Sequence, residues 1–154
     1  MPDPQRSEAV AWHRKFAAAT NNRAWELSVQ ERSAAESREM LSAAYASAWH
    51  WAQVGSELNR MRATMLLAEV HALLGFGKSA LASAEEVREY FLRVETPEWE
   101  VAFVHVIHAH AASVAGEVAK HRSSYELALA ALAAIPDEEE RNIVASTFSH
   151  VPRP

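Results

Sequence analysis

The sequence contains no cysteine, which excludes disulfide bonds, thiolate metal ligands and a cysteine nucleophile. No apolar run approaches the roughly 20 residues that span a bilayer, and the first residues lack the basic and apolar stretches of a secretory signal. We therefore expect a cytoplasmic protein with no membrane partner. The formal net charge of -5 gives no general attraction to phosphate backbones, so we also expect no nucleic-acid partner.

Glycine and proline are scarce but regularly placed. The four glycines and the two internal prolines mark boundaries near positions 55, 76, 97, 116 and 136. Because glycine destabilises a helix interior and proline breaks it, this spacing predicts helices of similar length folded back on one another. A chain of 154 residues, 49% of them hydrophobic, is long enough for one core. We expect a single all-α domain over residues 1–150 and a disordered tail over residues 151–154.

Capping residues predict where the individual helices begin, since Ser, Thr and Asp side chains bind the free N–H groups of a first turn. We expect a first helix from Pro4 to about Ser28 after Asp3, a second with a capping box of Ser33 and Glu36 that ends at Gly55, and a third after Ser56 that ends at Gly75. A fourth helix is expected over about residues 78–93, a fifth with Thr96 as cap and Pro97 in its first turn that ends at Gly116, and a sixth over about residues 117–134. A second capping box, of Asp137 and Glu140, is expected to begin a short last helix.

A weak internal repeat relates Gly75 to Gly116, with an alanine, Ala68 or Ala109, seven residues before each glycine. Here the chain resembles a tetratricopeptide-type helical repeat, in which small residues let paired helices approach closely. The resemblance implies antiparallel helical hairpins stacked as a short right-handed superhelix of about seven helices. The expected pairs are the first helix with the second, the third with the fourth and the fifth with the sixth, and the seventh covers the open end.

Further residues carry a closer resemblance over most of the chain: Trp25, Leu27, Met40, the run 46–55 (ASAWHWAQVG), Asn59, Arg62, Val70, Leu74 and Gly75. In these positions the chain is similar to a family of small uncharacterised bacterial tetratricopeptide-like proteins. The resemblance implies the fold, and it implies no catalytic residues and no cofactor.

In a tetratricopeptide-like stack, the first helices of successive pairs line a concave groove that holds a peptide or a helix. The residues predicted to line it are Arg62, Met65, Glu69, Phe103, Val106, His110 and Ser113. We therefore predict a non-enzymatic module that binds a protein or peptide, and the mixture of side chains suits an amphipathic segment. The alternative is that these residues pack in the core or at a dimer contact. An open-ended stack exposes an apolar edge, and a homodimer is one way to cover it.

The histidines point to a competing function. His105 and His108 are one helical turn apart, a spacing that can direct two imidazoles at one metal ion. His71, on the neighbouring third predicted helix, could supply a third nitrogen. The spacing is a weak indication, since no HExxH motif is present. The other interpretation is that these histidines are hydrogen-bonded packing residues, and no metal site is assigned.

Ser47, His50 and Trp51 form the most distinctive local cluster. A serine hydrolase would also need an orienting acid and an oxyanion hole, so we interpret the cluster as a buried polar clamp between the second and third helices. A small-molecule pocket beside these residues is the alternative. The competing function is therefore a small-ligand or metal-binding helical protein that uses His50, His71, His105 and His108.

Overall fold

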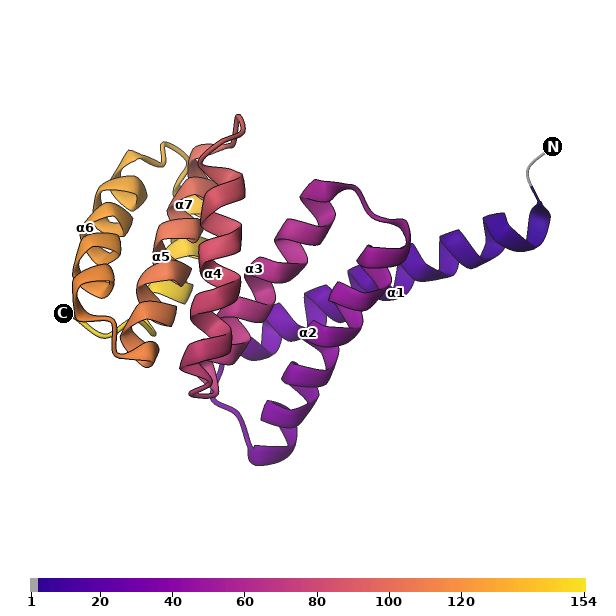
Figure 1. Cartoon of the computed structure of the whole chain (residues 1–154), viewed down its shortest axis with the longest axis horizontal. Helices are drawn as coiled ribbons and strands as arrows, with labels where there is room; N and C mark the ends of the chain where they lie inside the picture. Colours follow the sequence, from indigo (N-terminus) through magenta and orange to yellow (C-terminus); the bar gives the residue numbers. More distant parts are fainter. Residues whose placement is uncertain (1–2) are drawn as a thin grey trace. The chain divides into compact units, whose positions relative to one another are not determined.

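The computed structural model describes residues 3–154, and over that range it contains seven α-helices and no strand, which confirms the all-α class (Figure 1). The helices are α1 (Pro4–Ser28), α2 (Ala34–Val54), α3 (Glu57–Leu73), α4 (Gly77–Phe91), α5 (Glu98–Ala115), α6 (Val118–Ala134) and α7 (Glu138–Phe148). Within the described residues, no helix has the length and apolar character needed to cross a membrane.

The contacts of the chain gather in two compact units, of which the first ends at Leu67 and the second begins at Ala68, inside α3. Helices of a repeat stack contact mainly their neighbours, so compact units of this kind also arise within one domain. The single domain over residues 1–150 and the right-handed superhelix stay predictions.

Capping hydrogen bonds set most of the helix starts. Ser33 and Glu36 form the predicted capping box, in which the Glu36 N–H donates to Ser33 Oγ at 3.2 Å and the Ser33 N–H donates to Glu36 Oε2 at 2.8 Å. Three further predicted caps, Asp3, Ser56 and Asp137, each accept a hydrogen bond from a backbone N–H of the following turn. These bonds satisfy N–H groups that have no partner within the helix. The predicted starts of α1, α2, α3 and α7 are confirmed.

The start of α5 differs from the prediction. Thr96 Oγ1 donates to the carbonyl oxygens of Phe91 and Val94, at 3.1 Å each, so it stabilises the end of α4 and does not cap α5. Pro97 is the N-cap of α5, without a side-chain cap, and the helix begins at Glu98. The prediction that Thr96 caps α5 is therefore wrong, because its hydroxyl is bonded to the chain at the end of α4.

Two glycines end helices by their backbone conformation. Gly75 has a φ angle of 82° and Gly116 a φ angle of 77°. Side chains with a Cβ atom rarely adopt this left-handed conformation, so glycine allows the chain to turn directly after α3 and α5. Both helix ends are where the sequence predicts them.

In the first unit, α1 packs against α2, as predicted for the first helical pair. The contact buries Ala17, Ala24 and Leu27 of α1 and Met40, Ala43 and Ala44 of α2, and small residues allow the two helices to lie close together. The first turns of α1 extend beyond the end of α2 (Figure 1), and residues 3–9 are exposed.

In the second unit, α5 is the central helix. It contacts α4, α6 and α7, and it lies between α4 and α6 (Figure 1). Every residue from Ala102 to Ala112 is buried, so the helix has neighbours on several sides. The predicted pairing of the fifth and sixth helices is confirmed, and α7 contacts both of them.

The last residues contact the second unit. Val151 is 6% exposed, and the carbonyl oxygen of Pro152 lies 2.8 Å from Nε2 of His121 on α6. The sequence analysis predicts disorder over residues 151–154. In the structure, Val151 is instead buried and the Pro152 carbonyl oxygen is hydrogen-bonded to His121 of α6.

Candidate functional site

Five aromatic rings from α1 and α2 meet in the first unit. Trp12 and Phe16 are one turn apart on α1, and their rings stack with centroids 5.6 Å apart. The His50 ring of α2 lies 5.7 Å from the Phe16 ring and 5.0 Å from the Trp49 ring, and His13 lies 5.5 Å from Trp49. We call these five residues, Trp12, His13, Phe16, Trp49 and His50, the aromatic surface.

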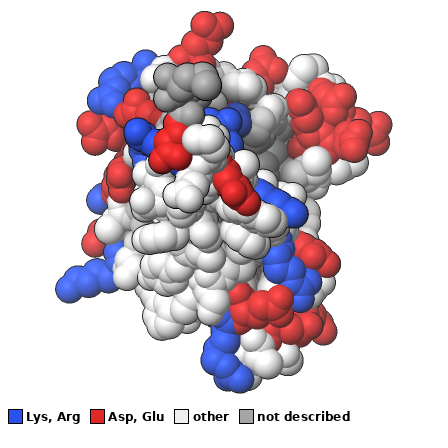
Figure 2. Space-filling view, turned by 90° about the vertical axis from the view of Figure 1, so that its right-hand side faces the viewer, with Lys and Arg blue, Asp and Glu red and all other residues white. Residues whose placement is uncertain are grey.

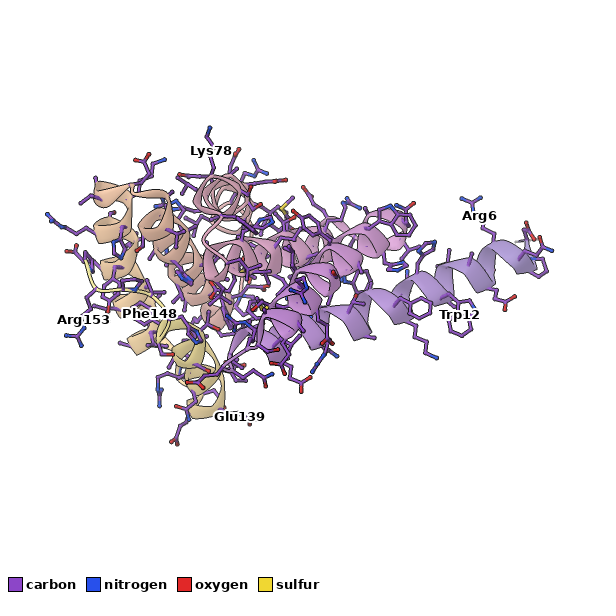
Figure 3. All side chains as sticks on the ribbon, turned by 90° about the horizontal axis from the view of Figure 1, so that it is seen from below. Arg6, Trp12, Lys78, Glu139, Phe148 and Arg153 are labelled. Atoms are coloured by element: carbon purple, nitrogen blue, oxygen red, sulfur yellow. The ribbon has the colours of Figure 1, made fainter. Side chains whose placement is uncertain are left out.

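The large apolar members of the aromatic surface are accessible to solvent. Trp12, Phe16 and Trp49 are 47%, 45% and 58% exposed, and Lys15 Nζ lies 4.8 Å from the centre of the Trp12 ring. Figure 3 shows the Trp12 side chain on the opposite side of α1 from Arg6. Adjacent exposed aromatic rings of this kind are typical of a contact site for another molecule.

Figure 2 shows the face of the molecule that lies on the right in Figure 1. Lys and Arg side chains alternate with Asp and Glu side chains around an area without charged groups. On this face the described residues form no continuous basic patch. The face therefore carries no strong field of one sign.

Two of the three residues predicted to form a cluster on α2 have partners on α1. Ser47 is fully buried, and its Oγ donates to the carbonyl oxygen of Ala17 at 3.1 Å. His50 Nδ1 lies 2.9 Å from Nδ1 of His13 and is hydrogen-bonded to it. The predicted polar clamp is therefore present, but it joins α2 to α1 and not to α3. Trp51 is half-buried.

Sequence reasoning singled out His50 but missed the three members of the aromatic surface on α1, which are Trp12, Phe16 and His13. The sequence feature that could have indicated His13 is its place beside Trp12 and one turn before Phe16, on the stretch of α1 that carries the exposed rings. The pairing with His50 spans 37 residues of sequence, and no local pattern predicts it.

A polar network built around the buried side chains of His108 and Ser124 joins α4, α5 and α6 in the second unit. His108 is fully buried, with Nδ1 2.6 Å from Ser124 Oγ and Nε2 3.2 Å from Glu85 Oε1. Lys120 Nζ donates to the same Glu85 oxygen at 2.7 Å. The contact between Nε2 and Glu85 is within ion-pair distance but lacks the geometry of a hydrogen bond, so Nε2 has no hydrogen-bond partner among the described residues. Because a carboxylate only accepts, we assign the ring proton to Nε2, so that Nδ1 accepts the Ser124 hydroxyl proton.

Burial and the neighbouring groups together set the charge state of this network. Burial lowers the pKa of His108, against the opposing effect of the Glu85 carboxylate. Burial alone would raise the pKa of Glu85, but Lys120 and His108 outweigh it and the pKa is lowered. At neutral pH the network therefore combines a neutral imidazole with a carboxylate that is paired with an ammonium group.

The three histidines considered for a metal site do not form one. Among residues 3–154, no group of three or more His, Asp or Glu side chains is arranged to hold a metal ion. Burial lowers the pKa of His71, and burial together with the charge of Arg88 and the neighbouring His108 lowers the pKa of His105 to about 4. His105 Nδ1 has no hydrogen-bond partner among the described residues. These are the properties of neutral packing histidines.

Most residues predicted to line the groove are buried. Arg62 and Ser113 are half-buried, whereas Met65, Glu69, Phe103, Val106 and His110 are each at most 7% exposed. Glu69 on α3 and His110 on α5 pair with each other, with His110 Nδ1 3.0 and 3.1 Å from the two carboxylate oxygens. Five of the seven side chains thus pack inside the chain, which corresponds to the alternative considered for them.

Comparisons with known proteins do not add a family to these observations. No family model matches the chain, and neither a curated protein nor a solved structure matches it. The resemblance to tetratricopeptide-like proteins therefore stays a prediction, and the candidate site is defined by its own geometry.

Proposed function

We propose that this chain is a non-enzymatic module that binds a protein or peptide, and that the aromatic surface of α1 and α2 is its contact site. The observation that carries the proposal is the exposure of Trp12, Phe16 and Trp49 on adjoining parts of one helical pair. Exposed aromatic side chains supply much of the binding energy at protein interfaces, because each covers a large area and has few rotamers to fix.

The chemistry of the surface defines the partner that fits it. The rings favour apolar side chains, and Lys15 beside Trp12 adds one positive charge. A segment with an apolar face and a carboxylate at its edge would satisfy both, which describes an amphipathic helix or peptide. The net charge of -5 argues against nucleic acid. A cytoplasmic location is part of the proposal.

The burial of Ser124 and His108 supports a structural role for their contacts with each other and with Glu85. A serine hydroxyl beside an imidazole and a carboxylate has the composition of a nucleophile, a base and an acid. Ser124 and His108 are, however, 1% and 0% exposed. A substrate needs access to the nucleophile, so we assign the network to the packing of α4, α5 and α6.

The test is a selection of peptides from a displayed random library on the wild-type chain, followed by affinity measurements on purified peptides. We expect peptides with apolar and acidic residues, and an affinity loss of at least about tenfold in Trp49→Ala and in Phe16→Ala. Val118→Ala is the matched control, since Val118 is an apolar residue on α6 that is 67% exposed.

Two outcomes would contradict the proposal. The first is that selected peptides bind Trp49→Ala and Phe16→Ala as tightly as the wild type. The second is a wild-type dimer in sedimentation velocity that becomes a monomer in Trp49→Ala, because the surface would then be covered by a second copy of the chain.

A further inference from the structure

His13 and His50 direct the same ring nitrogen at each other across the contact of α1 and α2. The two Nδ1 atoms are 2.9 Å apart, and the ring centroids are 5.1 Å apart. Both nitrogens therefore lie between the two rings. A hydrogen bond at this distance needs one Nδ1 that carries a proton and one that offers a lone pair.

We propose that His13 and His50 form a two-histidine binding site for a transition-metal ion such as Cu²⁺ or Zn²⁺, held by the two Nδ1 atoms. This inference does not depend on the proposed peptide binding. On metal binding, the shared proton leaves Nδ1 and Nε2 of the same ring takes one up from water, so both imidazoles stay neutral. Two nitrogen–metal bonds form and two water molecules leave the hydrated ion.

The distance between the nitrogens is close to what such an ion requires. Metal–imidazole bonds of about 2.0–2.1 Å separate two nitrogens by about 2.8–3.0 Å at a right angle and by about 3.3–3.4 Å in a tetrahedral site. The observed 2.9 Å fits the right angle of tetragonal Cu²⁺ and needs a small opening for Zn²⁺. Small side-chain rotations must turn both lone pairs toward the ion. The two rings can make these rotations because they are only half-buried.

The surroundings of the pair shield it in part while leaving positions for water. The Trp49 ring lies 5.0 Å from the His50 ring and 5.5 Å from the His13 ring, and Phe16 lies 5.7 Å from His50. These rings shield the histidine pair from water on the sides that they occupy. Because no third His, Asp or Glu completes a cluster among residues 3–154, water fills the remaining coordination positions.

The experiment is a titration of the full chain with Cu²⁺ and separately with Zn²⁺, in a buffer that does not coordinate metals. Calorimetry should give one Cu²⁺ per chain with a Kd below about 10 μM and weaker Zn²⁺ binding, following the usual order of affinities. Cu²⁺ should also quench tryptophan fluorescence, since Trp49 adjoins the site.

Variants locate the binding. His13→Gln and His50→Gln should each weaken Cu²⁺ binding by at least about tenfold. His150→Gln, which removes a half-buried histidine of the second unit, is the matched control and should bind as the wild type does. Binding that is equal in all three variants, or no wild-type binding at about 100 μM Cu²⁺, would overturn the proposal.

A second measurement on the wild-type chain covers the case in which a glutamine variant does not fold. Stoichiometric Zn²⁺ should shift the NMR signals of the ring protons of His13 and His50 together. Shifts confined to other histidines would overturn the assignment equally well.

Discussion

The hydroxyl of Ser124 on α6 lies 2.6 Å from Nδ1 of His108 on α5, and both side chains are at most 1% exposed. The pair forms a polar contact between α5 and α6, on a helix, α5, whose buried residues are mostly apolar. Burial makes this contact matter for stability, because a buried polar atom without a partner is costly.

Ser124→Ala should lower the free energy of unfolding by about 1–3 kcal/mol, because it leaves the buried His108 Nδ1 without its partner. Urea unfolding monitored by circular dichroism measures the change. Ser123→Ala, at the exposed neighbouring position, is the control and should stay within about 0.5 kcal/mol of the wild type. Equal effects of the two variants would show that the bond contributes nothing.

Stability should fall as the pH is lowered below neutrality, with His105 as one cause. Its pKa is lowered from 6.5 to about 4 in the folded chain, so the unfolded chain takes up a proton first. The contribution of the neutral ring is therefore complete above about pH 6.5 and is lost progressively toward pH 4, by about 2–4 kcal/mol.

Urea unfolding at several pH values checks the role of His105. Since carboxylates also titrate in this range, the quantity to compare is the pH dependence of the wild type and of His105→Gln. The variant should show the weaker dependence. An identical dependence in both chains would assign the acid sensitivity to other groups.

Gly77→Ala should be destabilising because of space. A Cβ atom at this position would lie 2.7 Å from the carbonyl oxygen of Val114 and 2.8 Å from backbone atoms of Ala115, so α4 and α5 would have to move apart. We expect a loss of about 1–3 kcal/mol in thermal or urea unfolding. Gly77→Asn should cost at least as much.

Gly75 provides the contrast to Gly77. A Cβ atom at Gly75 would meet no atom within 4 Å, but the φ angle of 82° disfavours alanine. Asparagine tolerates this conformation better, so Gly75→Asn should cost less than Gly75→Ala. The opposite ranking would mean that space, and not backbone conformation, requires glycine there.

Ser47→Ala should remove the hydrogen bond that joins α2 to the carbonyl oxygen of Ala17 on α1, at a cost of about 1 kcal/mol. Urea unfolding measures it, with Ser37→Ala, a half-buried serine of the same helix, as the control. The change should also weaken metal binding by His13 and His50, because it loosens the contact between the two helices that hold them. A stability equal to that of the control would contradict a clamp between α1 and α2.

The sequence by itself determined the helices and most of their ends. Ser33 with Glu36 starts α2 and Gly116 ends α5 where the sequence predicts, because capping and left-handed turns depend on residues within about four positions of each other. Thr96 is the exception, because its hydroxyl reaches back to Phe91 as easily as forward to α5.

Only the tertiary structure decided which side chains meet. The pairing of His13 with His50, and of Glu69 with His110, depends on how each helix is rotated about its axis and how far it slides along its neighbour. An alanine-rich helix, or one such as α5 that is buried on several sides, carries no single apolar stripe to fix that rotation. For this reason the predicted groove residues were found inside the chain, while the exposed aromatic surface on α1 and α2 emerged only from the packing of the two helices.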